Sequence, residues 1–345
     1  MKNNFETMQH VRIVIPCRNE ASYIGPCLDS IISASHELAQ LSVYVVDGMS
    51  DDGTRAIIET YSKRHSFISL HDNKCMTTPF ALNIGVRSMD FDIVIILGAH
   101  SVIDENFIDR NVQLLSQHPE VGCSGGIIQN VHENEWSEII SMSMSSAFGV
   151  GNAHFRTGGK SGYVDTVAFG AYRREVFEKI GFFDEELARN QDDEFNFRVT
   201  QAGFKIYLDP TIISNYYVRG SIFKLYKQYG QYGYWKVFVN KKHGTVTSLR
   251  QLAPPAWVSF LLLGWLGIFF LPLALYLYVS GIVVYVSIAS LVAAKYKLKS
   301  LSRFARLLLC FFVLHFSYGL GYLKGISHFY LLNRFPSAKS ELLTR

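Results

Sequence analysis

The sequence has few cysteines, and their arrangement gives no sign of a metal or redox centre. The five thiols are scattered, without a C-x-x-C pair or zinc-finger spacing: Cys17, Cys27, Cys75, Cys123 and Cys310. Thiols spaced in this way indicate a reducing compartment rather than a disulfide-stapled secreted domain. The net charge is only +4, which gives no support for a nucleic-acid partner. The first ten residues hold no apolar run, so no secretory signal is expected.

Apolar residues are abundant, and their distribution predicts membrane segments near the C-terminus. Residues 257–294 contain no charged side chain, which is long enough for two crossings of about 20 residues each. Pro272 is placed to end or kink the first. A third apolar run, 307–323, is interrupted by His315. We therefore expect two or three membrane helices, at about 257–275, 277–294 and 305–323, and whether the third crosses stays open.

The segments around these helices carry the basic residues. The loop at 295–306 has five lysines and arginines, which places it on the cytoplasmic side by the positive-inside rule. Residues 221–244 interleave seven aromatic side chains with lysines. Such a pattern is typical of an amphipathic helix in the headgroup plane, although a surface helix packed on a domain is the alternative. We predict an interfacial segment at 221–250 and a membrane region at 251–345.

The first 220 residues alternate strand-like and helix-like runs. β-branched runs at 11–16, 42–47 and 92–98 predict buried strands, and helices are expected at about 23–39 and 53–65. This alternation indicates an α/β domain with a mainly parallel sheet. Polar clusters follow the three strands, at 16–20, 47–54 and 98–101. Because ligands bind at the carboxyl ends of parallel strands, we expect these clusters to converge.

Three motifs in a fixed order carry a resemblance. The stretches "VIPCRNEASYIGPCLDSI", "VYVVDGMSDDGT" and "QDDEFNFRVTQAG" resemble family 2 inverting glycosyltransferases. Residues 164–199 look like the ExoA-like branch of bacterial exopolysaccharide glucosyltransferases. The resemblance implies a GT-A nucleotide-sugar-binding domain over residues 1–220, a nucleotide-sugar donor and a divalent cation, Mn²⁺ or Mg²⁺.

The resemblance assigns nucleotide-binding roles to two of the polar clusters. The turn after the first strand would line the base and ribose through Pro16, Arg18, Asn19 and Glu20. Asp47, at the end of the second strand, would accept the imide N–H of uracil, and Asp51 would add a polar contact. Asn19 or Glu20 could also cap the helix that follows the first turn, and Asp51 or Asp52 could cap the helix that starts near Gly53.

A histidine stands where the family presents an acidic pair. The third strand of relatives ends in Asp-x-Asp, whereas this chain has Gly98-Ala99-His100. The acidic contact at position 98 is lost, and His100 holds the position that would meet the metal. Imidazole is a poor ligand for Mg²⁺ and a fair one for Mn²⁺. The alternatives are a cationic donor to the diphosphate and a packed loop histidine.

The acidic cluster at 191–194 supplies the expected catalytic base. Counting back from Phe195 and Arg198 places Asp192 at the family's base position, with Gln191 in place of a glutamate. Asp193 and Glu194 are the runners-up, and Asn190 is the expected helix cap. An acidic cluster favoured by the helix dipole is the alternative. Contacts to acceptor or phosphate are assigned to three further residues: Arg198, Gln231 and Trp235.

Together these features predict an inverting glycosyltransferase of the cell inner membrane with its catalytic domain in the cytoplasm. It would move a hexose from a nucleotide sugar, such as UDP-glucose, to a polyprenyl-diphosphate-linked saccharide in surface polysaccharide synthesis. Two alternatives stay open. One is transfer directly to polyprenyl phosphate. The other is an inactive nucleotide-binding partner of a polysaccharide assembly complex. The absence of an acidic residue at position 98, which is Gly98, supports this alternative.

Overall fold

The β-branched runs form the parallel half of a sheet. A computed structural model describes residues 9–35, 40–218 and 220–335. In it, four parallel strands lie in the order β3-β2-β1-β4: β1 (Val11–Cys17), β2 (Leu41–Asp47), β3 (Ile68–Asp72) and β4 (Ile93–Ile96). The helices between them are α1 (Ile24–Ser33), α2 (Thr54–Arg64) and α3 (Thr78–Val86). The helix predicted at 23–39 ends early at Ser33, and residues 36–39 lie outside the described part.

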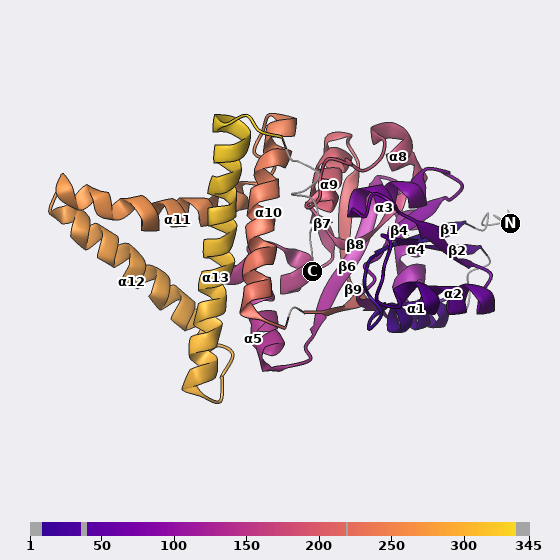
Figure 1. Ribbon diagram of the computed structural model, residues 1–345, viewed down its shortest axis with the longest axis horizontal. Coiled ribbons are helices and arrows are strands. Elements are labelled where there is room, and N and C mark those ends of the chain that lie inside the picture. The colour runs from indigo at the N-terminus through magenta and orange to yellow at the C-terminus, as the bar shows by residue number, and fades with distance from the viewer. Residues whose placement is uncertain (1–8, 36–39, 219, 336–345) are drawn as a thin grey trace. The chain divides into compact units, whose positions relative to one another are not determined.

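The other half of the sheet is antiparallel, which the sequence did not predict. β8 (Ala168–Arg173) pairs antiparallel with β4 and with β6 (Val121–Val131). β9 (Lys205–Tyr217) pairs antiparallel with β5 (Ser101–Ile103) and β7 (Gly162–Val164). Three helices complete this part: α4 (Phe107–Gln117), α8 (Arg174–Ile180) and α9 (Gln191–Gln201). The α/β class is confirmed, with a mixed sheet (Figure 1).

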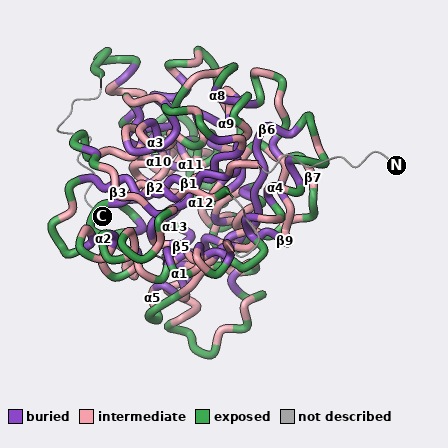
Figure 2. Tube along the Cα trace, turned by 90° about the vertical axis from the view of Figure 1, so that its right-hand side faces the viewer, coloured by how far each residue is buried: buried purple, intermediate pink, exposed green. Residues whose placement is uncertain are grey.

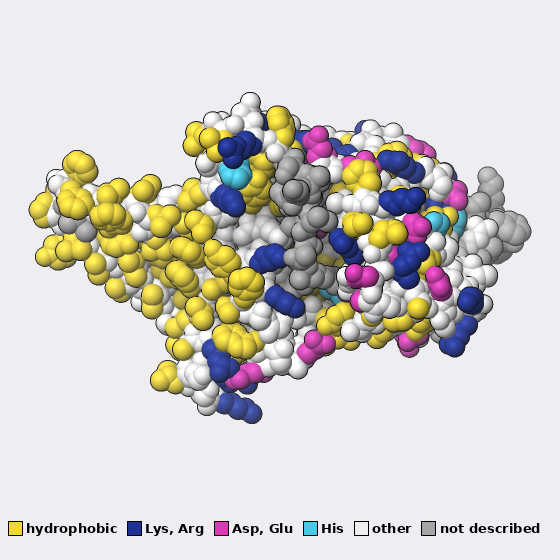
Figure 3. All heavy atoms as spheres, in the orientation of Figure 1, with side chains coloured by type: hydrophobic (Ala, Val, Ile, Leu, Met, Phe, Trp, Pro, Cys, Tyr) yellow, Lys and Arg dark blue, Asp and Glu magenta, His cyan; other side chains and the backbone are white. Residues whose placement is uncertain are grey.

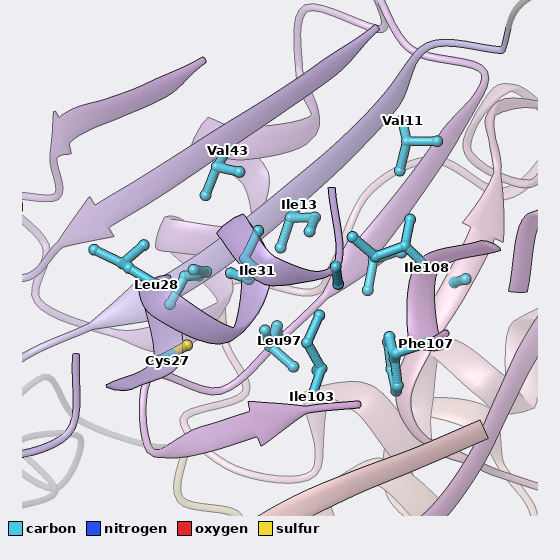
Figure 4. Close-up of a cluster of buried hydrophobic side chains, with 14 of the residues drawn as sticks. Val11, Ile13, Cys27, Leu28, Ile31, Val43, Leu97, Ile103, Phe107 and Ile108 are labelled. Carbon is cyan, nitrogen blue, oxygen red and sulfur yellow. The ribbon is translucent and has the colours of Figure 1, made fainter. Parts of the chain in front are cut away.

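The core lies between the sheet and the helices that cover it. Figure 4 shows side chains of α1, among them Cys27, Leu28 and Ile31, near Ile13 and Val43 of the two neighbouring strands. All five side chains are buried. Most residues of β1 and β4 are buried, and Figure 2 shows buried residues in the interior and exposed ones at the surface. The sheet therefore provides a rigid base for the loops at its carboxyl edge.

One arginine of the sheet, Arg12, is buried. Arg12 of β1 is 1% exposed and its Nη1 lies 2.7 Å from Asp90 Oδ1. The same nitrogen donates to Ser88 Oγ at 2.6 Å, and the guanidinium lies 4.0 Å from the centre of the Tyr44 ring. Hydrogen bonds from Arg12 and Ser88 hold the pKa of Asp90 well below its usual value.

Asp90→Asn is expected to destabilise the fold at neutral pH and to matter little in acid. A carboxyl group whose pKa is lowered by folding stabilises the native state above its unfolded pKa, and this stabilisation is lost as the pH falls. The Asp90 side chain is 58% exposed, so solvent screening keeps the loss on the order of 1 kcal/mol. Melting temperatures of wild type and variant in detergent should differ at pH 7, and the difference should shrink progressively as the pH falls below about 4. Glu59→Gln, at an exposed position of α2, is the matched control. An undiminished difference in acid would contradict the pairing.

A second compact unit combines the C-terminal helices with an internal segment. It contains Asn130–Thr157 and the chain from Tyr217 onward, whereas the sheet unit comprises the chain up to Gln129 and Gly158–Tyr216. The internal segment forms α5 (Glu135–Met144), α6 (Ala147–Val150) and α7 (His154–Thr157). Its place with the C-terminal helices is a feature that the sequence did not indicate.

The long helices of this unit, α10 (Ile222–His243) and α13 (Leu301–Ile326), pack closely through glycines. A Cβ built on Gly321 would stand 2.0 Å from the Gly230 carbonyl oxygen, and one on Gly233 2.0 Å from the Tyr318 carbonyl oxygen. Only glycine permits such backbone approach. α10 covers the segment predicted to lie at the membrane interface, and Trp235 and Phe238 are buried in it.

Between them lies an apolar hairpin. A 3₁₀ turn, η1 (Leu249–Leu252), precedes α11 (Ala253–Leu263), which continues as a 3₁₀ helix, η2 (Gly264–Phe269), and α12 (Leu273–Ala294) returns. The turn comes at residues 270–272, a few residues before the predicted position. Within the described residues, α12 and the helix from Leu301 to Leu331 are long and apolar enough to span a membrane. Hydrophobic side chains cover the exposed surface of the hairpin (Figure 3).

Candidate active site

The loops that follow β1 and β2 are held together by hydrogen bonds. Asn19 has a left-handed backbone (φ +55°), its N–H donates to Ser50 Oγ at 2.8 Å, and its Oδ1 accepts the Asp51 N–H at 3.1 Å. The Glu20 N–H donates to Thr54 Oγ1 at 2.8 Å. β4 lies directly beside β1. The three predicted polar clusters therefore follow neighbouring parallel strands, at one edge of the sheet.

The N-cap residues of α1 and α2 are not among the residues that the sequence offered as caps. The N-caps of α1 and α2 are Tyr23 and Gly53, and neither makes a side-chain cap. Asp52, rather than Asp51, binds the start of α2: its Oδ1 accepts the Thr54 N–H at 3.0 Å. Burial raises the pKa of Asp52, but hydrogen bonds from Thr54 outweigh it, so that the pKa is lower than usual. The Asp51 side chain is exposed and available to a ligand.

Asp47 is fully buried and bound within the chain. Its Oδ2 accepts the Ser50 N–H at 3.0 Å and Arg55 Nη1 at 2.8 Å, and its Oδ1 accepts the Ser50 hydroxyl. Arg55 also bridges to Asp72 at 2.8 Å. An imide N–H could reach Asp47 only after the Ser50 hydroxyl or Arg55 yields. The sequence pointed to the Asp47 carboxylate, but not to its hydrogen bonds with Ser50 and Arg55.

Arg18 and Pro16 border the same edge. Pro16 lies in β1 opposite Val46 of β2 and is partly buried. The exposed Arg18 side chain lies over Gly48, since a Cβ at Gly48 would stand 3.3 Å from both Cβ and Cδ of Arg18. A larger residue at position 48 would displace this arginine, which is an exposed cation at the mouth of the site.

His100 stands next to the carboxylate of Glu20. Nδ1 of His100 lies 3.7 Å from Glu20 Oε1, and its ring meets Tyr216 of β9 edge-on at 4.9 Å. Glu20 is 3% exposed. A separation of 3.7 Å is too long for a hydrogen bond, but it suits an ion pair if the imidazole is protonated. The sequence placed these two residues in separate roles, and the structure brings them together.

The Phe169 ring occupies the space beside Gly98, where relatives have an acidic side chain. A Cβ at Gly98 would stand 3.2 Å from Phe169 Cε1 and 3.6 Å from His100 Cε1. Phe169 has φ +50°, a left-handed backbone that is costly for a bulky residue. Phe169 therefore fills the space into which a side chain at position 98 would extend. No sequence motif pointed to Phe169.

The residues around His100 fit a divalent cation only together with a ligand. Within the described chain, no group of three or more His, Cys, Asp and Glu side chains gathers as a metal site. His100 and Glu20 offer two donors, and ligands at about 2.1 Å in octahedral geometry lie roughly 3 Å apart. Nitrogen and carboxylate donors suit Mn²⁺. The remaining ligands would come from a diphosphate and water, so this pair fits a cation carried by a nucleotide.

The acidic residues at the start of α9 have different environments. Asn190 is the N-cap, as predicted, although its side chain makes no capping bond. Glu194 is 2% exposed and its carboxylate binds Arg198 Nε at 2.7 Å and Nη2 at 2.9 Å. Asp192 is exposed, and its Oδ1 accepts the Asp193 N–H at 2.9 Å. Of the three acids, Asp192 is the one most open to a substrate, and Glu194 is held in an ion pair.

An aromatic cluster anchors α9. Phe195 is fully buried and stacks on Phe183 at 4.2 Å. Tyr172 of β8 meets Phe195 at 5.3 Å and donates to Asn196 Oδ1 at 2.9 Å. Burial, and then the nearby Cys123 and Asp192, raise the pKa of Tyr172 well above its usual value. Tyr172 pairs with β4, so the start of α9 is tied to the strand that leads to His100.

The three residues assigned to acceptor or phosphate are engaged elsewhere or lie in the other unit. Besides Glu194, Arg198 donates to the carbonyl oxygens of Ile180 and Phe182, each at 2.8 Å. Arg198 therefore joins α9 to the end of α8. Gln231 and Trp235 belong to α10 in the second unit, and Trp235 is 2% exposed.

Comparison with known proteins identifies the family. Residues 12–181 match the family model "Glycosyl transferase family 2". A dolichyl N-acetyl-alpha-D-glucosaminyl phosphate 3-beta-D-2,3-diacetamido-2,3-dideoxy-beta-D-glucuronosyltransferase of Methanococcus voltae is 30% identical over 243 residues, 68% of this chain and 75% of the relative. The chain belongs to glycosyl transferase family 2. The succinoglycan biosynthesis protein ExoA of Rhizobium meliloti (strain 1021) is 27% identical, over 71% of this chain and 74% of that protein.

Solved structures confirm the fold of this family 2 enzyme. The mannosyltransferase PcManGT from Pyrobaculum calidifontis, solved with GDP-Man and Mn²⁺, has a TM-score of 0.58 at 18% identity, over 90% of this chain and 86% of that one. Staphylococcus aureus TarS 1-349 has a TM-score of 0.51 at 16% identity, over 67% of this chain and 64% of that one. The prediction of a family 2 glycosyltransferase with an ExoA-like relationship is confirmed. The predicted roles of single residues remain predictions.

Proposed function

We propose that this family 2 enzyme is an inverting hexosyltransferase that uses a UDP-hexose and a polyprenyl-diphosphate-linked saccharide on the cytoplasmic face of the inner membrane. The observation that carries the proposal is the edge of the sheet where the loops after β1, β2 and β4 lie side by side. Asn19, Asp51 and Arg18 at that edge would bind the nucleotide, and the His100–Glu20 pair would face the diphosphate. Relatives that act in lipid-linked saccharide and succinoglycan synthesis support the class of acceptor.

The donor is held by the two joined loops. Pro16 and Asn19 would border the base and ribose, and Arg18 would reach the phosphates, since it is exposed at the mouth of the site. Asp47 would meet the imide N–H of uracil once the Ser50 hydroxyl is displaced. The bond from Asn19 Oδ1 to the Asp51 N–H keeps both loops in register during this exchange.

The transfer needs one proton acceptor. The acceptor hydroxyl attacks the anomeric carbon, Asp192 takes its proton, and the bond from that carbon to the diphosphate oxygen breaks, so that UDP leaves and the configuration inverts. A divalent cation held by His100 and Glu20 would neutralise the charge of the departing diphosphate. Arg18 would add a second positive charge. Phe169 would shape the space beside His100.

Two alternative functions would use the site differently. Direct transfer to polyprenyl phosphate would use the same Asp192 but a shorter acceptor. An inactive assembly partner would need the nucleotide site alone. The exposed carboxylate of Asp192 at the first turn of α9 supports an active enzyme over the inactive partner, because the neighbouring Glu194 is committed to an ion pair with Arg198.

Mass spectrometry of lipid-linked saccharides in a deletion strain tests the proposal. We expect an intermediate that lacks one hexose to accumulate, and a plasmid with the wild-type gene to restore the longer species. The Asp192→Asn gene should fail to restore it. An unchanged pool of lipid-linked saccharides would contradict the proposal. Restoration by Asp192→Asn would favour the inactive partner, and loss of a polyprenyl-phosphate hexose would favour direct transfer.

A further inference from the structure

The outer face of α13 is apolar over most of its length, with the exposed Ser302 near its start and Lys324 near its end. Leu301 is 82% exposed, Leu309 44% and Phe312 38%. These positions continue at helical spacing to the partly exposed Phe316, Leu320 and Leu323. A continuous stripe of this kind, on a helix whose other face is packed, is suited to a lipid environment on one side only.

The inner face of α13 contacts α5, α6 and α10 along its length, with polar contacts at a few positions. At its start Arg306 Nη1 lies 2.6 Å from Glu135 Oε2 of α5, and Arg303 binds Glu138. At its middle the His315 Nε2–H donates to the Phe148 carbonyl at 2.8 Å. Beyond its end Lys241 of α10 donates to Asn333 Oδ1 at 2.7 Å. If α13 crossed a bilayer, the segment around Phe148 that contacts its middle would enter the bilayer too.

The alignment of α10 with α13 shows which residues of α10 lie beside the middle of α13. A Cβ on Gly321 would touch the Gly230 carbonyl, and one on Gly325 would stand 2.8 Å from the Tyr234 carbonyl. The two helices therefore run parallel, and a step of four residues along α13 matches a step of four residues along α10. Lys227 and Lys224, both exposed, then lie beside the middle of the apolar run of α13. The centre of a bilayer is an unfavourable place for exposed lysines.

The hairpin turn is apolar instead of polar. Phe269 is 76% exposed, Phe270 88% and Leu271 52%. A turn that emerged into water would expose these apolar side chains to water. The backbone N–H groups of Phe270 and Leu271 are already hydrogen-bonded, because both donate to the Gly267 carbonyl oxygen at 3.0 Å. Backbone bonded in this way is compatible with hydrocarbon. The turn is therefore suited to remain inside the membrane.

The hairpin is also too short to cross from a surface at α13. The Tyr285 hydroxyl donates to His315 Nδ1 at 2.8 Å, so this part of α12 lies against α13. From Tyr285 back to Leu273, where α12 begins, the helix extends by about 18 Å. The hydrocarbon core of a bilayer is about 30 Å thick. A hairpin rooted at α13 would thus end within the core.

Cations mark both ends of α13. Lys295, Lys297 and Lys299 precede it, and Lys324, Lys241 and Lys242 lie near its other end. Figure 3 shows Lys and Arg side chains at both ends and hydrophobic side chains between them. Two cationic ends at one membrane surface would each meet anionic headgroups.

We propose that α13 lies in the plane of the membrane interface and that the α11–α12 hairpin enters the bilayer and returns to the same side. The partner is an anionic lipid surface. The lipid-facing surface consists of the hairpin and the outer stripe of α13, and the charged faces of α5 and α10 stay in water. This proposal rests on membrane association alone and holds whichever sugar is transferred.

Cysteine labelling tests the proposal in the full-length protein. Native Cys75 is exposed and reports the side of the sheet unit, and the other four thiols are buried. In a Cys75→Ser background, which keeps the four buried thiols, one accessible cysteine at a time is introduced by Lys299→Cys, Arg334→Cys or Phe270→Cys. A membrane-impermeant maleimide is added to right-side-out and to inverted vesicles. Lys299→Cys and Arg334→Cys should label at the face where Cys75 labels in wild type, and Phe270→Cys at neither face until detergent is added.

Other outcomes overturn the proposal. Labelling of Arg334→Cys at the face opposite to Lys299→Cys would show that α13 crosses. Labelling of Phe270→Cys without detergent, from either face, would show that the turn is in water. Should a cysteine variant fail to fold, wild type and Trp265→Phe are compared in lipids brominated near the bilayer centre. Quenching that depends on Trp265 is expected, and its absence would place the hairpin outside the core.

Discussion

Asp192→Asn is expected to lower turnover by about 10²- to 10⁴-fold, because the reaction loses its positioned proton acceptor. Donor binding should be unchanged, since the Asn19–Asp51 region that would hold the nucleotide is on the loops after β1 and β2. The side chain is exposed at the first turn of α9, so an isosteric amide should fold normally. Turnover is measured as UDP release with acceptor present, and donor affinity by calorimetry.

Two neighbouring variants serve as controls. Asp193→Asn removes the same charge one position along and should keep most activity. Glu194→Gln should act on stability instead, because it breaks the buried pair with Arg198. A fully active Asp192→Asn together with an inactive Asp193→Asn would shift the base by one position.

His100→Ala is expected to lower activity on the order of 10²-fold, the typical loss when one group that stabilises a developing charge is removed. If His100 ligates the cation, the variant should also bind Mn²⁺ more weakly in the presence of UDP, which electron paramagnetic resonance of free Mn²⁺ measures without turnover. Binding should depend on the nucleotide, because His100 and Glu20 supply only two donors.

His100→Asp separates the two roles of this histidine. A carboxylate would restore the donor type that Mg²⁺ prefers, so the preference for Mn²⁺ should decline. If His100 is instead a cationic donor to the diphosphate, wild type should stay active in EDTA and His100→Asp should be inactive with either ion. Full activity of wild type in EDTA would contradict the metal role.

The parallel half of the sheet could be predicted because its signal is local. Buried strands are continuous β-branched runs, and the runs at 11–16 and 42–47 became β1 and β2 with nearly the same bounds. The antiparallel half was missed, because β6, β8 and β9 pair across long stretches of chain. The helices of residues 130–157 were missed for a related reason. Their partners, such as Arg303 for Glu138, are more than 160 residues away.

The candidate site divides in the same way. Asp47, Asp192 and His100 were found from motifs, since each follows a strand or begins a helix. Their surroundings could not be read from spacing. The Arg55 clamp on Asp47, the Glu20 carboxylate beside His100 and the Phe169 ring beside Gly98 all depend on how separate loops meet. These contacts decide what a ligand must displace.

The most direct test of the central claim is transfer by the purified full-length protein in detergent. It is supplied with UDP-hexose labelled in the sugar, Mn²⁺ and lipid-linked saccharide extracted from the deletion strain. Label is expected to move into the lipid fraction with one UDP released per sugar, nuclear magnetic resonance should show a β-linkage from the α-linked donor, and Asp192→Asn should form no product. An α-linked product, or UDP release without any sugar in the lipid fraction, would contradict the central claim.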